Sequence, residues 1–210
     1  EAVGSPLTRA NTQFGELMAA GDYFSTPDSA LLDAITGDFT LAVNFSATNL
    51  SAVNDAIVSK YVSSVNCSYL LRISTGFPQL FVSQDDTGSS QNFITGSVNL
   101  TSVAANDENL WLIAQYDISA DEVTFSYSLQ SPTTTASALV PVALGTVQSL
   151  VSTGIYNGTQ SLMYGAHGAT GTGDNFAGRI NRGYVIASTD LTVSPVSDFT
   201  PGSYVSGSTL

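Results

Sequence analysis

Apolar and polar residues alternate one by one along several stretches of this chain, and this alternation constrains the fold more than any other feature. It is clearest in residues 38–46 (DFTLAVNFS), 109–117 and 122–129. Successive side chains of a β-strand point to opposite faces, so a period of two predicts strands with one buried face. Shorter strands are expected at residues 55–61, 69–74 and 79–83.

Polar turns separate these predicted strands, and the tight connection at 117–122 predicts a hairpin. Many short strands joined in this way are typical of an antiparallel sandwich or jelly roll, so we expect an all-β fold of two packed antiparallel sheets. The helical signal is weak. We expect one turn within residues 29–35 and a short helix within 11–21 that ends at Gly21.

The chain of 210 residues is long enough for one sandwich domain. We predict an N-terminal arm at residues 1–21, a jelly-roll domain at 22–193 and a C-terminal tail at 194–210. Residues 131–153, rich in Ser, Thr and Ala, are expected to form an insert within that domain. None of the flanking segments is long enough to bury a core of its own.

Charge narrows the choice of partners. Charged residues make up 10% of the chain, well below the usual quarter, and the formal net charge is −12. Nucleic-acid binding requires clustered Lys and Arg, and a net negative charge repels nucleic acids and anionic membranes. We therefore expect neither as a partner. A surface of Ser, Thr, Asn, Gln and Gly suits an extracellular or densely assembled protein.

Catalytic groups are scarce. Cys67 is the only cysteine, which excludes an intrachain disulfide, and we expect it to be a small buried apolar residue. His167 is the only histidine and lies in the turn-like sequence GAHGATGTG, where we expect a solvated loop side chain instead of a catalytic imidazole. No Ser-His-Asp arrangement, phosphate-binding loop or zinc motif is present. The sequence predicts no catalytic residues and no enzyme.

Cofactor binding is not expected either. The segments 83–92 and 171–176 carry Asp and Asn oxygens of the kind that bind Ca²⁺, but neither has the spacing of an EF-hand. Asp and Gly in such segments are ordinary turn residues. We predict no cofactor and no metal ligand, with a loop calcium ion as the less favoured alternative.

Residues 174–187 (DNFAGRINRGYVIA) hold two of the five basic residues, Arg179 and Arg182. The inward-facing residues of this strand change parity near Asn181–Arg182, which predicts a β-bulge there. Arg179 then faces outward, and Arg182 lies on the bulge. We expect Gly178 and Gly183 to lie where another chain segment approaches closely. The expected inward set is Phe176, Gly178, Ile180, Gly183 and Val185.

Three sequence patterns resemble a known family. FAGRINRGYVIA is similar to the closing strand of LamG-like domains of the concanavalin A-like jelly rolls. DYFSTPDSALLDAITGDFTLAVNF, together with AIVSKY and SYLLRISTGFPQLFVSQD, resembles a variant of this domain found in bacteriophage tail and virion proteins. The resemblance spans about residues 22–190. It departs from the family pattern at Ala34, which stands between Asp33 and Ile35, and at Tyr61, where the family usually has Trp. Residues 131–153 have no obvious match in the family.

The resemblance implies a jelly-roll fold and a virion-surface or extracellular setting. It also implies that Lys60 and Arg72 pair with a carboxylate such as Asp33 or Asp38. The leading hypothesis is a non-enzymatic virion structural protein, either a capsid decoration protein or a tail-associated one. It would assemble through its N-terminal arm and sheet edges with other virion proteins or copies of itself.

The alternative is a carbohydrate-binding module that recognises host surface glycans. Sugar binding requires an exposed aromatic ring with polar neighbours. Phe77, in the turn-like TGFPQ, is the candidate glycan contact, whereas Trp111 alternates with apolar residues and is expected in the core.

Overall fold

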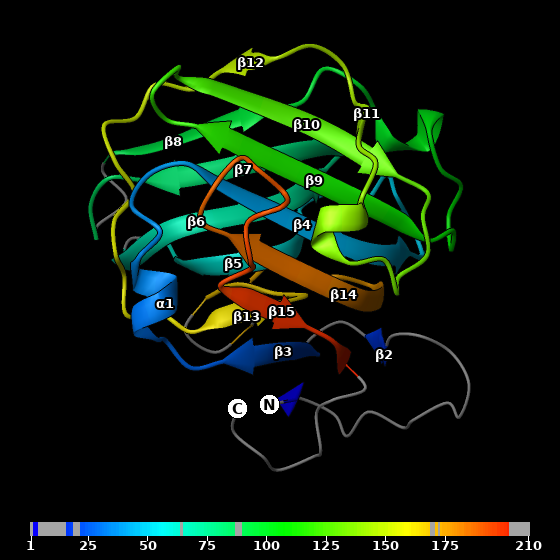
Figure 1. Ribbon diagram of the computed structural model, residues 1–210. Helices are drawn as coiled ribbons and strands as arrows, with labels where there is room; N and C mark the ends of the chain where they lie inside the picture. Colours follow the sequence, from blue (N-terminus) through cyan, green and yellow to red (C-terminus); the bar gives the residue numbers. More distant parts are fainter. Residues whose placement is uncertain are drawn as a thin grey trace.

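The computed structural model describes residues 2–3, 16–18, 22–63, 65–86, 90–168, 171 and 173–201. Its strands form two antiparallel sheets that pack face to face (Figure 1). Sheet A has the order β1 (Ala2–Val3), β3 (Tyr23–Thr26), β13 (Leu162–Tyr164), β5 (Asp55–Val62), β6 (Val65–Ser74), β7 (Phe77–Ser83) and β8 (Gln91–Thr95). The predicted all-β sandwich is therefore confirmed.

Sheet B has the order β11 (Val142–Ala143), β10 (Glu122–Ser128), β9 (Leu110–Asp117), β4 (Phe39–Ala47), β14 (Gly178–Ile186) and β15 (Ser197–Phe199). Two more short strands belong to it, because β12 (Gln148–Ser149) pairs with β10 and β2 (Glu16–Met18) pairs with β14. The described helices are the single turns α1 (Ala30–Asp33), η1 (Leu100–Ser102) and η2 (Ala136–Ala138).

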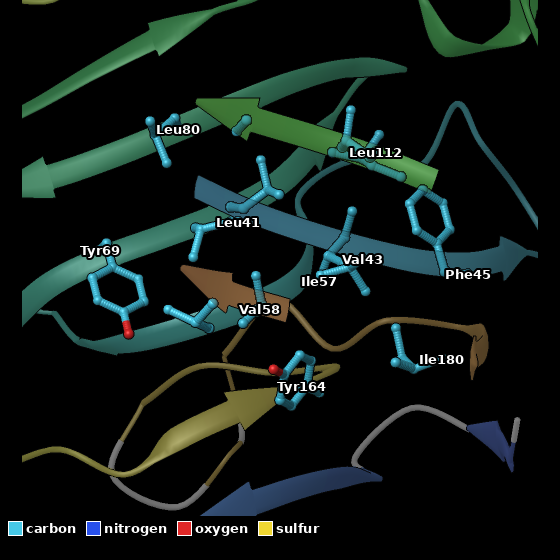
Figure 2. Close-up of a cluster of buried hydrophobic side chains, with 14 of the residues drawn as sticks. Leu41, Val43, Phe45, Ile57, Val58, Tyr69, Leu80, Leu112, Tyr164 and Ile180 are labelled. Atoms are coloured by element: carbon cyan, nitrogen blue, oxygen red, sulfur yellow. The ribbon is translucent and has the colours of Figure 1, made fainter. Parts of the chain in front are cut away.

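The core lies between the two sheets and is built from the alternate residues that the sequence pattern predicts. Phe39, Leu41, Val43 and Phe45 of β4 are fully buried in it. They face the inward side chains of sheet A, such as Leu71 of β6, because period-two strands present one apolar face each. Figure 2 shows this layer and labels Leu41, Val43, Phe45, Ile57, Val58, Tyr69, Leu80, Leu112, Tyr164 and Ile180.

A second apolar layer covers the outer face of sheet B. Trp111 of β9 stacks on Tyr184 of β14, with ring centroids 5.5 Å apart and planes 3° from parallel. Ala136 and Leu139, from the segment around η2, bury these rings, and Figure 1 shows η2 lying over the sheet. Trp111 is buried as predicted, but outside the central core. The predicted insert at 131–153 thus supplies a part of the packing.

Short strands protect both long edges of sheet B. On β14, β2 pairs with Gly178–Ile180 and β15 pairs with Gly183–Val185. On β10, β12 pairs with Glu122–Val123 and β11 with Ser126–Tyr127. Because these short strands already pair with most of β10 and β14, little continuous backbone is left at either edge for another chain to pair with.

Two predicted boundaries need correction. The sandwich does not end at residue 193, because β15 pairs with β14 and Phe199 is 1% exposed, stacked on Tyr164 with centroids 4.3 Å apart. The predicted helix at 11–21 is wrong in its middle, where β2 (Glu16–Met18) is a strand; its other residues lie outside the described ones. The described parts of the predicted arm, β1 and β2, both pair with strands of this chain.

The predicted bulge in β14 is confirmed. The register against β4 shifts between Ile180 and Arg182, so that Asn181 is the extra residue. Ile180 and Val185 consequently both face the core although their parity differs. The single predicted turn of helix at 29–35 is also present, with the Ser29 hydroxyl accepting a hydrogen bond from the Leu32 backbone N–H as the N-cap of α1.

Gly178 permits a close backbone contact that no larger residue would allow. Its φ is +151°, and a Cβ there would collide with the Ser46 carbonyl oxygen and lie 2.9 Å from Ala47 Cα. We expect Gly178→Ala to lower the free energy of unfolding by about 2–5 kcal/mol, because backbone strain and overpacking each cost about 1–3 kcal/mol. Chemical denaturation measures this change.

The matched control is Gly154→Ala, since a Cβ at Gly154 would have nothing within 4 Å. This variant should unfold close to the parent. Equal losses in the two variants would contradict the close approach at Gly178.

Candidate functional site

The outer face of sheet A carries a group of aromatic, charged and amide side chains that we call the Arg72 face. Strand alternation places them there, because inward residues such as Leu71, Leu80 and Ile94 lie between them along the chain. The Arg72 face consists of Tyr61, Arg72, Gln79, Phe81, Gln91, Phe93 and Thr95, with His167 and Asp174 at its side.

Arg72 is the centre of this face. Its Nη1 lies 2.7 Å from Asp174 Oδ2, and its Nε donates to Gln79 Oε1 at 2.9 Å. The guanidinium also lies over the Phe81 ring, 4.4 Å from its centroid, in a cation–π contact. Its side chain is 18% exposed, and its remaining N–H donors have no partner among the described residues. These donors are available to a ligand.

An aromatic platform continues from Arg72 to the edge strand β8. Phe81 stacks on Phe93, with centroids 5.0 Å apart and planes 19° from parallel. Phe81 is 7% exposed whereas Phe93 is 57% exposed, so Phe93 presents a free ring surface to solvent. Tyr61 also packs against Phe81, with ring centroids 6.4 Å apart, and donates from its hydroxyl to Gln91 Oε1 at 2.8 Å. Burial raises the pKa of Tyr61, so its hydroxyl keeps its proton at neutral pH.

His167 does not fit the prediction of a solvated loop side chain. Its ring packs edge-on against Tyr61 and over Gly173, and its Nε2 lies 3.4 Å from Asp174 Oδ2. The side chain is 15% exposed, and its Nδ1 is buried without a hydrogen-bond partner in the described structure. The physical reason is that the backbone of His167 bridges that of Gly173, and the next N–H, of Gly168, donates to the Tyr61 carbonyl of β5 at 2.9 Å.

Asp174 links His167 to Arg72. Burial alone would raise the pKa of Asp174, but the hydrogen bonds from His167 and Arg72, together with their charges, lower it below its ordinary value. Asp174 is thus an ionised acceptor that orients the guanidinium. Asp55, at the start of β5, has its pKa raised to about 6, chiefly by burial; a hydrogen bond from Ala177 lowers it and the charge of Asp174 raises it further.

The ion pairs predicted for Lys60 and Arg72 are only partly confirmed. Lys60 Nζ lies 2.9 Å from Asp28 Oδ1 and 3.5 Å from Asp33 Oδ1, so the predicted pairing with Asp33 is confirmed and Asp28 is a closer partner. Asp38 forms no ion pair with the basic residues that the structure describes; it accepts a hydrogen bond from the Ile118 backbone N–H at 3.0 Å. Arg72 pairs with Asp174 instead of Asp33 or Asp38.

Phe77, the predicted glycan contact, is the first residue of β7 and half-buried. It shares the outward parity of Gln79 and Phe81, so it lies at the margin of the Arg72 face, roughly 13 Å along the strand from Phe81. Its role stays a prediction. The sequence pattern does not single out Phe93, because QNFIT is too short for its alternation to stand out. In β8 the alternation turns Phe93 to the outer face and Ile94 to the core.

The remaining predictions concern metal binding, Cys67 and membrane spans. The described residues contain no group of three His, Cys, Asp or Glu that could hold a metal ion. Cys67 is buried in the apolar floor of the Arg72 face, as predicted. None of the helices formed by the described residues has the length and hydropathy of a membrane span.

Comparison by sequence gives no relative, since no protein-family model and no curated protein matches the chain. Solved structures do match it in shape. The CBM40 of the Ruminococcus gnavus IT-sialidase, solved bound to α2,3-sialyllactose, superposes with a TM-score of 0.52 and 12% identity. The match covers 90% of this chain and 93% of that one.

Domains LG4-5 of the mouse laminin α1 chain match with a TM-score of 0.54 and 12% identity, over 82% of this chain and 42% of that one. The binding domain of botulinum neurotoxin DC in complex with SialylT gives 0.50 and 11%, over 80% of this chain and 36% of that one. The chain thus spans less than half of these two proteins. At such identities the likeness establishes the fold alone, a jelly-roll sandwich of two antiparallel sheets, and none of these structures connects the chain to virions.

The raised pKa of Asp55 makes stability depend on pH. The ordinary value of 3.8 applies in the unfolded chain, so the folded state binds the proton more tightly. This contribution to stability is complete below about pH 4 and is lost as pH rises through about 6. We expect Asp55→Asn to unfold with a free energy that falls less than that of the parent between pH 5 and pH 7.

Urea denaturation at several pH values measures this difference. Asp86→Asn, at an exposed position in the β7–β8 turn, is the control and should follow the parent's pH dependence. A parent and an Asp55→Asn variant with the same slope would rule out an elevated Asp55 pKa.

Proposed function

We propose that this protein is a non-enzymatic carbohydrate-binding module and that the Arg72 face binds the glycan. The exposed ring of Phe93, stacked on the buried Phe81 and followed by Arg72, is the observation that carries the proposal. A pyranose has an apolar face of C–H groups and a rim of hydroxyls, so it needs an aromatic surface with hydrogen-bonding groups beside it.

The Arg72 face offers both parts on a rigid sheet. Phe93 supplies the stacking surface, while Gln91, Thr95 and the unused donors of Arg72 supply hydrogen bonds along its sides. Gln79 holds Arg72 and also donates to Thr95 Oγ1 at 2.7 Å, so these side chains are oriented before a ligand arrives. Preorganised groups lose little entropy on binding.

The comparisons support this choice of ligand class. The CBM40 neighbour was solved with α2,3-sialyllactose and the toxin domain with SialylT, so two chains of similar fold bind sialylated ligands. Glycans of this kind lie outside cells, and we propose a surface or extracellular setting for this protein as well.

Assembly into a virion, the leading hypothesis from the sequence, has less support. Such assembly requires an arm that is free to contact a neighbour, or a sheet edge that is open to one. The described parts of the arm pair with this chain's own β3 and β14, and short strands flank both edges of sheet B. Placement on a virion stays a prediction.

Phe93→Ala tests the proposal. On a glycan array, and by calorimetry with α2,3-sialyllactose and neutral oligosaccharides, we expect the best ligand to bind at least about tenfold more weakly than to the parent, because the stacking surface is lost. Phe93 is 57% exposed, so the fold should persist.

Val140→Ala is the control and should bind normally, because Val140 is 66% exposed and follows Leu139, which packs on the outer face of the opposite sheet. Phe77→Ala separates the two aromatic candidates. Unchanged binding by Phe93→Ala would refute the Arg72 face as the glycan site, and loss in Phe77→Ala alone would move the site to the margin of β7.

A further inference from the structure

A pocket of about 230 Å³ lies on the outer face of sheet B, on the opposite side of the sandwich from the Arg72 face. Residues 135–137, around η2, form one wall, and the β14–β15 connection forms the other. Figure 1 shows both segments lying over the sheet near β14. Arg182, Tyr184 and Asp198 line its base, and we call it the Arg182 pocket.

The base is a stack of three planar side chains. The Arg182 guanidinium lies over Tyr184, 4.9 Å from the ring centroid, and Tyr184 stacks in turn on Trp111. The Tyr184 hydroxyl donates to the Thr134 carbonyl at 2.9 Å. Burial raises the pKa of Tyr184 to about 12, despite the opposing charge of Arg182, so this donor persists at neutral pH. The base is therefore held in one arrangement.

Arg182 and Asp198 offer donors and acceptors side by side. Arg182 Nε and Nη2 lie 3.2 and 3.0 Å from the two carboxylate oxygens of Asp198, and Nη1 donates to the Thr133 carbonyl at 3.3 Å. The guanidinium keeps further N–H donors without a partner among the described residues. Asp198 is 48% exposed and keeps free lone pairs. Neighbouring hydroxyls of a sugar donate and accept at once, which this pair can match.

The walls are amphipathic. Leu191, Val193 and Pro195 give an apolar surface, while hydroxyls such as those of Thr135 and Ser137 surround it. The volume is below the roughly 300–1,000 Å³ of pockets for drug-sized ligands, so it suits one small ring. The charge of Arg182 is already balanced by Asp198, and the chain carries −12 overall, which disfavours anions.

From these observations we propose that the Arg182 pocket is a second binding site, for a single uncharged pyranose ring. It is separate from the Arg72 face and does not depend on glycan binding there. The apolar wall takes the C–H face of the sugar, and Arg182 with Asp198 binds two adjacent hydroxyls.

Trp111 makes the pocket measurable, because it is the only tryptophan and stacks beneath Tyr184. Methyl pyranosides of glucose, galactose and mannose are titrated into the full chain while Trp111 emission and the amide NMR signals of Arg182, Tyr184 and Asp198 are followed. We expect a saturable change with at least one sugar.

Val193→Phe fills the pocket without adding a tryptophan, and Val193 is 41% exposed, so the fold should tolerate it. We expect it to weaken binding at least about tenfold. Val147→Phe changes a residue that is 52% exposed and outside the pocket lining, so its affinity for the pyranoside in the Arg182 pocket should stay within about twofold of the parent. Phe93→Ala, expected to weaken glycan binding on the Arg72 face, should leave the change in Trp111 emission caused by binding in the pocket unaltered. Melting temperatures check folding.

Asp198→Ala gives a second readout, because it leaves Arg182 without its counter-charge. This variant should lose affinity for the pyranoside and gain at least about tenfold in affinity for inorganic phosphate. The proposal fails if no methyl pyranoside gives a saturable change, or if phosphate binds the parent more tightly than the sugars do. It also fails if Phe93→Ala abolishes the change while Val193→Phe keeps it, which would place all sugar binding on the Arg72 face.

Discussion

The bulge at Asn181 decides which way β14 faces, and both the core and the Arg182 pocket depend on it. The Asn181 side chain is 3% exposed and donates to Asn44 Oδ1 at 2.8 Å and to Asn109 Oδ1 at 3.0 Å. These bonds hold the extra residue in the sheet. Because of it, Ile180 and Val185 both reach the core, while Arg182 and Tyr184 both face outward. A strand without the bulge would turn one of these sets to the wrong side.

The bulge also places Gly183 against the ring of Tyr164 from sheet A. Gly183 follows the bulge directly, and a Cβ there would collide with the Tyr164 ring. Tyr164 is therefore able to lie across Gly183 and stack on Phe199 of β15. The last described strand is bound to the core through this ring, which is why the domain continues beyond residue 193.

Much of this architecture follows from the sequence because it depends on local periodicity. The alternation in 38–46 predicts the inward set of β4, and the change of parity near Asn181 predicts the bulge. What escaped prediction depends on contacts distant in the chain. His167 lies in a glycine-rich turn that resembles a solvated loop, yet it is held by Tyr61, more than a hundred residues earlier.

The same limit applies to the candidate sites. Arg72 and Asp174 are 102 residues apart, so their pairing has no signal in a single sequence. The insert at 131–153 appears featureless as a sequence because its apolar residues are scattered. Leu139, Leu144 and Leu150 are nevertheless buried, since each meets a different part of sheet B and its surroundings.

Arg72 and Arg182 share one arrangement on opposite sheets, although nothing in the sequence relates them. Each guanidinium lies over an aromatic ring and is oriented by one carboxylate, with donors left over. In a chain with five basic residues and a net charge of −12, this pairing keeps each site locally neutral and so suited to polar ligands of low charge.

Two sites on opposite faces would let one chain hold two sugar residues at once. Two weak sites raise each other's affinity only when a single ligand can reach both of them. The Arg72 face and the Arg182 pocket lie on opposite sides of the sandwich. Using both would therefore cross-link two glycans and would not strengthen the binding of either one.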